Sequence, residues 1–332
     1  MARSLSFAPI RAVCAGAAVA LALSACGGGS ESASRGTTPT TVATTNTTSA
    51  TASTAAEQQR GGPCAGHATP PAVYDHVIWI WMENKGFARV IGNADAPYET
   101  SVARLCATAT RFSGVGEPSL PNYLAATSGS THGVFDDDPP ADHPITADNL
   151  FRQVRARGGT ARSYQESMPG NCALDSSGRY AVKHNPAAYY VGGSDRSACK
   201  ADDVPLGDLG DGALRHDVDA DTLPAFSFVT PDLCNDTHDC SVATGDRWLQ
   251  QWLPVLLSSN SYAAGTTAIF VMWDEGSPIP FLAIAPTVPA GTVLDAEIDH
   301  YAVLRTTEEM LGIPTQLGAA AHAPSIRASL HA

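Results

Sequence analysis

His76-Val77-Ile78-Trp79-Ile80-Trp81-Met82 is an apolar run that stops at Glu83-Asn84, and Thr267-Ala268-Ile269-Phe270-Val271-Met272-Trp273 stops in the same way at Asp274-Glu275. Runs of this length, rich in β-branched and aromatic residues, predict strands that are buried on both faces, as the strands of a parallel sheet are. In open α/β sheets, ligands bind outside the carboxyl ends of such strands. The two runs therefore predict an α/β fold with a site where both strands end.

The four residues that follow these runs carry oxygen ligands. Carboxylate and amide oxygens are the ligands that hard cations prefer. Glu83, Asn84, Asp274 and Glu275 therefore predict a site for one divalent metal ion of the Mg, Ca or Mn type. The alternative is that each acidic pair caps a following helix or turn. Because two pairs stand at matched strand ends, we favour the metal site.

The composition limits the classes of partner. The chain has 332 residues, of which 44% are hydrophobic, so it is long enough to bury a large core. Its 33 acidic residues outnumber its 20 basic residues, which gives a formal net charge of −13. A nucleic-acid partner is not expected, because phosphate backbones require a basic surface.

The N-terminus has the features of a secretion signal. Residues 1–25 are predicted to be a signal peptide, with Arg3 and Arg11 before or within a short apolar segment that cannot span a bilayer. Leu23-Ser24-Ala25-Cys26 is similar to a bacterial lipobox. This similarity predicts an exported cell-surface lipoprotein that is attached to the membrane only through lipid on Cys26. The alternative is cleavage near Ala25 and free secretion.

A tether and one folded domain are expected after the signal peptide. Residues 26–62 are rich in Ser, Thr and Ala and contain almost no large apolar side chain, so they cannot bury enough surface to fold. The remaining residues, 63–332, are within the size range of a single α/β domain.

Six cysteines remain once Cys14 and Cys26 are set aside: Cys64, Cys106, Cys172, Cys199, Cys234 and Cys240. An even number in an exported protein predicts disulfides, although six cysteines allow fifteen connectivities. We expect sequential pairing, and most firmly the Cys234–Cys240 bridge, which closes the shortest loop. A zinc site is the alternative, but no pair has C-x-x-C spacing.

The chain after Cys64 alternates between strand-like and helix-like segments. Such alternation predicts one α/β domain with a mostly parallel central sheet. The predicted strands are His76–Met82, Ala161–Glu166, Ala225–Thr230, Thr267–Trp273 and Phe281–Ala285. The predicted helices are Thr100–Cys106, Tyr123–Ala126, Asn149–Arg157, Ser241–Leu257 and Tyr301–Leu311.

Three polar side chains in predicted loops are candidates for chemistry, and each has a structural alternative. Ser119 precedes a helical stretch between two prolines, where it could meet an anion, but from local sequence alone a role as helix N-cap is the simpler interpretation. His184 is a loop histidine that a surface role would also explain. His238 would lie at the tip of the small Cys234–Cys240 loop, whose rigidity suits catalysis. Asp236, in the same loop, is interpreted as a cap of the following helix.

Seven ordered motifs resemble those of the bacterial phosphoesterase family that contains phospholipases C and secreted acid phosphatases. They extend over essentially the whole chain after Tyr74. They are Met82-Glu83-Asn84-Lys85-Gly86-Phe87, Ser119-Leu120-Pro121-Asn122-Tyr123, Ser128-Gly129-Ser130-Thr131-His132-Gly133, His184-Asn185-Pro186, Asn235-Asp236-Thr237-His238-Asp239, Trp273-Asp274-Glu275-Gly276 and Asp299-His300-Tyr301. The resemblance implies an alkaline-phosphatase-like three-layer sandwich, with metal and nucleophile at the carboxyl ends of strands.

The resemblance also implies roles for individual residues. It gives the four strand-end residues as metal ligands and Ser119 as the nucleophile. His184 and His238 match histidines around the phosphate, and both are expected to be catalytic. Lys183 stands where some members carry another histidine. Lys183, Asn122 and His132 are expected to bind the substrate.

These features together predict an acid phosphatase that hydrolyses phosphate monoesters. Phospholipases C of the family commonly have threonine at the position of Ser119, so serine favours a monoesterase. The short sequence after Asp274-Glu275 resembles the short actinobacterial acid phosphatases. The alternatives are a phospholipase C that cleaves phosphodiesters and, in another class, a non-catalytic surface lipoprotein that binds a ligand.

Overall fold

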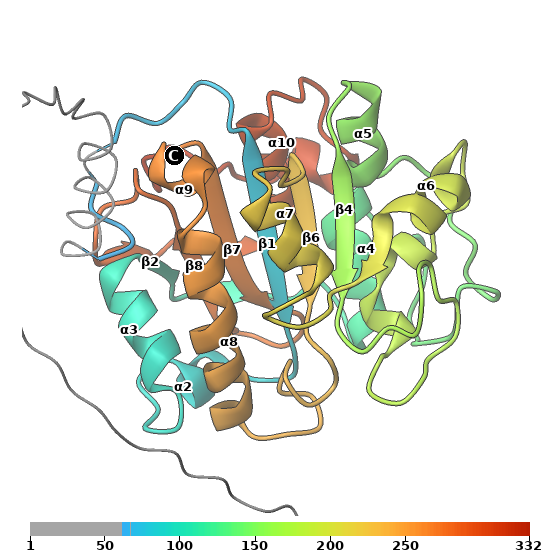
Figure 1. Cartoon of the computed structure of the whole chain (residues 1–332), viewed down its shortest axis with the longest axis horizontal. Helices are drawn as coiled ribbons and strands as arrows, with labels where there is room; N and C mark the ends of the chain where they lie inside the picture. The colour runs from blue at the N-terminus through green and yellow to red at the C-terminus, as the bar shows by residue number, and fades with distance from the viewer. Residues whose placement is uncertain (1–61, 67) are drawn as a thin grey trace, which may run out of the picture. The chain divides into compact units, whose positions relative to one another are not determined.

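The computed structural model describes residues 62–66 and 68–332 (Figure 1). The predicted signal peptide, Cys26 and residues 26–61 of the predicted tether lie outside the described residues.

An eight-stranded sheet forms the centre of the described chain, in the order β5-β4-β6-β1-β7-β8-β2-β9. Every pair within it is parallel except the two that β8 makes with β7 and β2, so the sheet is mostly parallel, as predicted. A second, two-stranded sheet pairs β10 with β3. The strands are β1 (His76–Met82), β2 (Ala107–Ala109), β3 (Phe112–Ser113), β4 (Ala161–Gln165), β5 (Asp203–Pro205), β6 (Phe226–Thr230), β7 (Thr267–Trp273), β8 (Phe281–Ile284), β9 (Thr292–Leu294) and β10 (Ile298–Asp299).

Helices cover both faces of the central sheet, which gives the predicted three layers. In Figure 1, α7, α8 and α9 lie in front of the sheet, and α4 and α10 lie behind it. The α-helices are α2 (Phe87–Val90), α3 (Pro97–Leu105), α4 (Ser119–Ser128), α5 (Leu150–Ala156), α6 (Asp195–Asp202), α7 (Ala213–Asp219), α8 (Val242–Leu257), α9 (Asn260–Ala263) and α10 (His300–Met310). The 3-10 helices are η1 (Val182–His184), η2 (Pro186–Ala188) and η3 (Gly318–Ala321).

Strand β1 is buried on both faces because successive side chains point to opposite layers. Trp79 and Trp81 point towards the layer of α4 and α10: the indole N–H of Trp79 donates to Thr307 Oγ1 at 3.0 Å, and the ring of Trp81 lies 4.5 Å from that of Tyr123. Met82 points the other way, towards Gly245 of α8, where an added Cβ would lie 2.8 Å from its methyl carbon. The side chains of β1 therefore pack against the helices on both faces of the sheet.

All the predicted strands and helices are present, but β2, β3, β5, β9, β10, α2, α6, α7 and α9 were not predicted from the sequence. The strands at residues 76–82 and 267–273 have the predicted bounds. Helix α4 extends beyond the predicted Tyr123–Ala126 at both ends. It begins directly after Pro118 and has Pro121 in its first turn. Proline is tolerated there, since the N–H groups of a first turn have no partner within the helix.

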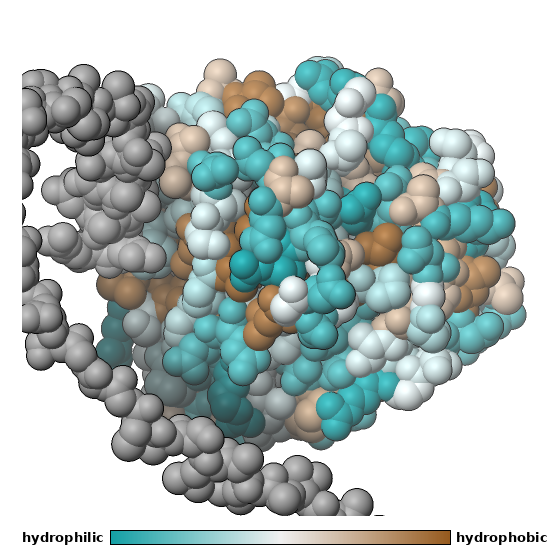
Figure 2. All heavy atoms as spheres, viewed as in Figure 1, coloured by the Kyte–Doolittle hydropathy of each residue, from teal (hydrophilic) through white to brown (hydrophobic). Residues whose placement is uncertain are grey.

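The surface carries few large apolar side chains. Figure 2 shows apolar residues scattered among polar ones on the face that it presents. Among the described residues, the exposed large hydrophobic side chains are Val73, Leu105, Phe135, Leu174 and Val293. Within the same residues, we find no helix whose length and apolar character would let it cross a bilayer.

Three disulfides join neighbouring cysteines in sequence: Cys64–Cys106, Cys172–Cys199 and Cys234–Cys240. The predicted sequential pairing is therefore confirmed. The first bridge ties the beginning of the described chain to the residue before β2, and the third closes a loop that follows β6.

The first bridge should contribute measurably to stability. Replacing both Cys64 and Cys106 by serine should lower the free energy of unfolding by about 2–5 kcal/mol, because the bridge restricts a segment of 42 residues in the unfolded chain. Chemical denaturation measures this change. Alkylation of the denatured, unreduced protein should find no free thiol among the six cysteines, and a reactive Cys64 or Cys106 would contradict the pairing.

Candidate active site

The carboxyl ends of β1 and β7 bring the two predicted acidic pairs together. The strands are parallel and pair Met82 with Trp273, so Glu83 and Asp274 leave the sheet side by side. Both side chains are fully buried. The backbone N–H of Asn84 donates to Asp274 Oδ1 at 3.1 Å, which joins the two strand ends. Asn84 has a positive φ of 57°, a conformation that asparagine tolerates better than most residues.

A third carboxylate, that of Asp236, comes from the loop after β6. The N–H of Glu83 donates to the carbonyl of Asp236 at 2.7 Å, and Thr237 Oγ1 donates to the carbonyl of Glu83 at 2.6 Å. The side chain of Asp236 is fully buried and accepts the N–H of His238 at 2.7 Å. It does not cap α8, so the predicted capping role of Asp236 is wrong.

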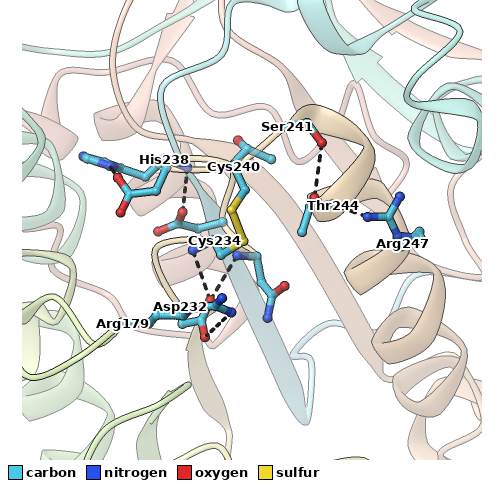
Figure 3. The surroundings of a disulfide bond; sticks show 12 residues. Arg179, Asp232, Cys234, His238, Cys240, Ser241, Thr244 and Arg247 are labelled. Carbon is cyan, nitrogen blue, oxygen red and sulfur yellow. Dashed lines mark hydrogen bonds and ion pairs between the residues drawn. A yellow bond between two sulfur atoms is a disulfide. The ribbon is translucent and has the colours of Figure 1, made fainter.

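The disulfide holds this loop against the start of α8. Figure 3 shows Asp232 on one side of the Cys234–Cys240 bridge and Thr244 of α8 on the other. Asp232 Oδ1 accepts the N–H of Cys234 at 3.1 Å. Gly245 permits the close contact, because an added Cβ would lie 2.4 Å from the methyl group of Thr237.

Ser119 is the first residue of α4, and its hydroxyl points into the carboxylate cluster. Ser119 Oγ donates to Glu83 Oε2 at 3.1 Å, and the hydroxyl of Tyr123, one turn later, donates to Glu83 Oε1. The N-cap position belongs to Pro118. The interpretation of Ser119 as a helix cap is therefore wrong.

Asn122 positions the loop that leads to Ser119. Its Oδ1 accepts the N–H groups of Val115 and Gly116, at 2.8 and 3.1 Å, and its Nδ2 donates to the carbonyls of Gly116 and Pro118. These four bonds occupy both the oxygen and the nitrogen of the Asn122 side-chain amide. The geometry thus favours a positioning role over the predicted contact with substrate.

His184 lies under the cluster, between two of its carboxylates. Its Nε2 is 3.3 Å from Glu83 Oε1 and its Nδ1 is 3.3 Å from Asp236 Oδ2. The imidazole stacks on Tyr123, with ring centroids 5.3 Å apart. Thr230 Oγ1, at the end of β6, donates to the carbonyl of His184.

Lys183 and His238 stand at the more exposed side of the cluster. His238 Nε2 lies 3.5 Å from Lys183 Nζ, and His238 Nδ1 lies 2.7 Å from Asp239 Oδ1. Lys183 also donates to Asp137 Oδ2 at 2.8 Å. Asp137 was not a candidate from the sequence.

His132 does not join these residues. Its Nε2 lies 2.8 Å from the hydroxyl of Ser128, the last residue of α4. Ser119 is the first residue of the same ten-residue helix, so the two ends lie about 14 Å apart. The predicted contact of His132 with substrate has no support in this placement.

Burial makes ionisation of the carboxylates costly. It raises the pKa of Glu83 well above its usual value, and the neighbouring charges of Asp274 and Asp236 raise it further. Burial also raises the pKa of Asp274, and that of Asp236 to about 8. At Glu275, burial and then the charge of Asp274 raise the pKa to about 7. The cluster thus favours added positive charge, either protons or a cation.

The residues fit a divalent cation. Three buried oxygens of this cluster accept no hydrogen bond from the described residues: Asp236 Oδ2, Asp274 Oδ2 and Glu275 Oε2. Glu83, His184 and His238 also each offer a ligand atom within 4.8 Å of the others. A cation at this cluster would satisfy oxygens that otherwise remain unpaired in a dry interior.

Three residues that sequence reasoning missed support the cluster: Tyr123, Asp137 and His300. His300 Nε2 lies 2.6 Å from the carbonyl of Asp274, and burial lowers the pKa of His300 to about 4, so a neutral imidazole donates this bond. Tyr123 and His300 both occur in the quoted motifs, which was the available signal. Asp137 lies in none of them.

The fold places the chain in a broad class. A protein of the alkaline phosphatase superfamily from Vibrio parahaemolyticus superposes with a TM-score of 0.52 over 79% of this chain and 73% of its own, at 12% sequence identity. At this identity the likeness concerns the fold alone. It confirms the predicted alkaline-phosphatase-like sandwich.

Sequence comparisons are more specific. The model of the Phosphoesterase family matches residues 93–278. A phosphatidylinositol-3-phosphatase from Mycobacterium tuberculosis is 32% identical over 76% of this chain and 82% of its own length. An acid phosphatase from Aspergillus fumigatus is 28% identical over 73% of this chain, which spans only 56% of that protein. The chain belongs to the phosphoesterase family, as the motifs predicted.

Asp274→Asn tests the cation site. Without metal, the variant should have a higher melting temperature than the wild type at neutral pH. The reason is that the substitution removes one repelling carboxylate from a buried acidic cluster. Divalent metal should stabilise the wild type, by about 2.7 kcal/mol at a hundredfold excess over Kd, and should leave the variant unchanged. Thermal melts with Mg²⁺, Ca²⁺ and Mn²⁺ measure both effects.

The matched control is Asp211→Asn, which removes the same charge from a side chain that is 85% exposed. Its response to metal should equal that of the wild type. An Asp274→Asn variant that metal stabilises as much as the wild type would show that the site lies elsewhere.

Proposed function

We propose that this protein is an exported acid phosphatase that hydrolyses phosphate monoesters, with Ser119 as nucleophile and one divalent cation. The observation that carries the proposal is the hydrogen bond from Ser119 Oγ to Glu83 Oε2, which aims the hydroxyl at the buried carboxylate cluster. The relatives support the substrate class: they are named as a phosphatidylinositol-3-phosphatase and as acid phosphatases, and both names denote removal of phosphate from a monoester.

Glu83, Asn84, Asp274 and Glu275 are the proposed ligands of the cation. Bound there, a divalent cation would neutralise phosphoryl oxygens and favour the alkoxide form of a nearby hydroxyl. The chain alone supplies the orientation. Glu83 accepts hydrogen bonds from both Ser119 and Tyr123, so the serine rotamer is fixed towards the cluster.

The proposed reaction has two displacements. Ser119 Oγ gives up its proton to Glu83 Oε2, to which it is hydrogen-bonded, and attacks phosphorus in line; the bond from phosphorus to the alcohol oxygen breaks. His238 acts as general acid and donates a proton to that oxygen. Water then attacks the phosphoserine and gives a proton to His238, the bond from phosphorus to Ser119 Oγ breaks, and Ser119 Oγ recovers its proton from Glu83 as inorganic phosphate leaves.

The basic side chains near the cluster suit a dianionic phosphoryl group. Burial acts to lower the pKa of Lys183, but its bond to Asp137 and nearby carboxylates have the larger combined effect, so the pKa is raised and the amine remains charged. Burial lowers the pKa of His184 well below its usual value. We therefore assign the fixed positive charge to Lys183, and we assign proton transfer to His238, whose Nε2 lies 3.5 Å from the Lys183 amine.

A phospholipase C remains the second candidate, because the same family motifs occur in enzymes that cleave diesters. Parallel assays with p-nitrophenyl phosphate and p-nitrophenyl phosphorylcholine separate the two. We expect kcat/KM to be larger for the monoester. Faster hydrolysis of the diester would favour the phospholipase, and no hydrolysis of either would favour a surface lipoprotein that only binds a ligand.

We also propose that the protein is exported and is anchored by lipid on Cys26. The three disulfides are compatible with an oxidising compartment. No nucleic acid is proposed as a partner, because the chain is acidic.

Ser119→Ala should lower kcat for p-nitrophenyl phosphate by at least roughly a thousandfold, because the proposed covalent step loses its nucleophile. The free energy of unfolding should fall by only about 1 kcal/mol, because one hydrogen bond is lost. The melting temperature should therefore change little. Ser113→Ala is the control, since its hydroxyl bonds to Ser277 Oγ outside the cluster. Near-normal kcat in Ser119→Ala would instead assign the attack to water.

A further inference from the structure

A line of charged and polar groups crosses the exposed side of the cluster. It begins at the start of α4, where the N–H of Leu120 donates to Asp137 Oδ1 at 3.0 Å. Asp137 Oδ2 then accepts Lys183 Nζ at 2.8 Å, and Lys183 Nζ lies 3.5 Å from His238 Nε2. Asp239 ends the line at His238 Nδ1.

Asp137 therefore connects Leu120 at the start of α4 with Lys183, the only lysine in this line. Leu120 directly follows Ser119, and Pro121 has no N–H to offer. The helix start that the sequence suggested as an anion site is thus occupied by the protein's own Asp137. Apart from a bound cation, a phosphoryl group on Ser119 would therefore meet positive charge on side chains rather than at this helix start, and Lys183 is the side chain that Asp137 holds.

We propose that Asp137 is a positioning residue for phosphoryl transfer, which holds the ammonium of Lys183 beside His238 so that it can receive a phosphoryl oxygen on Ser119. This inference rests on the proposed function.

Two observations support positioning rather than a stabilising surface ion pair. The side chains of Lys183 and Asp137 are only 22% and 28% exposed, so the pair lies partly buried beside the cluster and not on the open surface. Their placement is also specific. A lysine side chain is flexible, so a fixed ammonium position needs a partner that holds it. Asp137 supplies this partner, because one of its oxygens accepts the backbone N–H of Leu120 and the other accepts the amine.

The experiment combines Asp137→Asn with Lys183→Met in a double-mutant cycle. Asparagine can still accept the N–H of Leu120 through its carbonyl oxygen, but it no longer attracts the amine. Asp138→Asn is the matched control, because Asp138 is exposed and in the same loop. For each variant, kcat and KM for p-nitrophenyl phosphate, the inhibition constant of inorganic phosphate and the melting temperature are measured.

We expect Asp137→Asn to raise both KM and the phosphate inhibition constant about tenfold, to change kcat less, and to leave the melting temperature within about 2 °C of the wild type. In the Lys183→Met background, adding Asp137→Asn should change neither constant. This non-additivity separates positioning from a structural role.

Unchanged constants in Asp137→Asn would overturn the proposal. A lower phosphate inhibition constant would also overturn it, since Asp137 would then compete with phosphate for Lys183. Equal effects of Asp137→Asn with and without Lys183 would show that it acts through another group. A wild type that hydrolyses no monoester would instead refute the proposed function, before any variant is compared.

Discussion

The burial of three carboxylates at one end of the sheet is the constraint on which the rest of the site depends. Glu83, Asp236 and Asp274 are fully buried, and burial raises the pKa of each. Like charges in a dry interior repel one another strongly, so this arrangement requires protons or a cation to be stable. The parallel register of β1 and β7 places two of the three side by side, because Met82 and Trp273 are paired and Glu83 and Asp274 come next.

The surrounding structure positions these groups through bonds to backbone. The loop of Asp236 is joined to the end of β1 by hydrogen bonds in both directions and is closed by a disulfide. Lys85 Nζ donates to the carbonyl of Thr237 at 2.7 Å, which adds a nearby positive charge. Gly114 approaches from the other side, where an added Cβ would lie 2.9 Å from the carbonyl of Asp274. A side chain at Gly114 would therefore displace the carboxylate cluster.

The sequence predicted the elements whose patterns are long and missed what depends on contact between distant segments. The runs at 76–82 and 267–273 have the predicted bounds because buried strands need continuous apolar residues. Local sequence alone led to the interpretation of Ser119 as a helix N-cap. Only the motif resemblance indicated that Ser119 lies at the strand ends. Asp137 gave no signal, because its role comes from two partners, Leu120 and Lys183, that lie 17 and 46 residues away.

Ser119 is proposed to attack phosphate at a site that needs a divalent cation. The most direct test is acid quenching of the wild type during turnover of a monoester, with and without chelator, followed by peptide mass spectrometry. We expect a phosphoserine in the peptide that spans Glu117 to Tyr123 in the presence of metal, and none with chelator. Steady turnover with no phosphorylated peptide, or phosphate on a different residue, would contradict it.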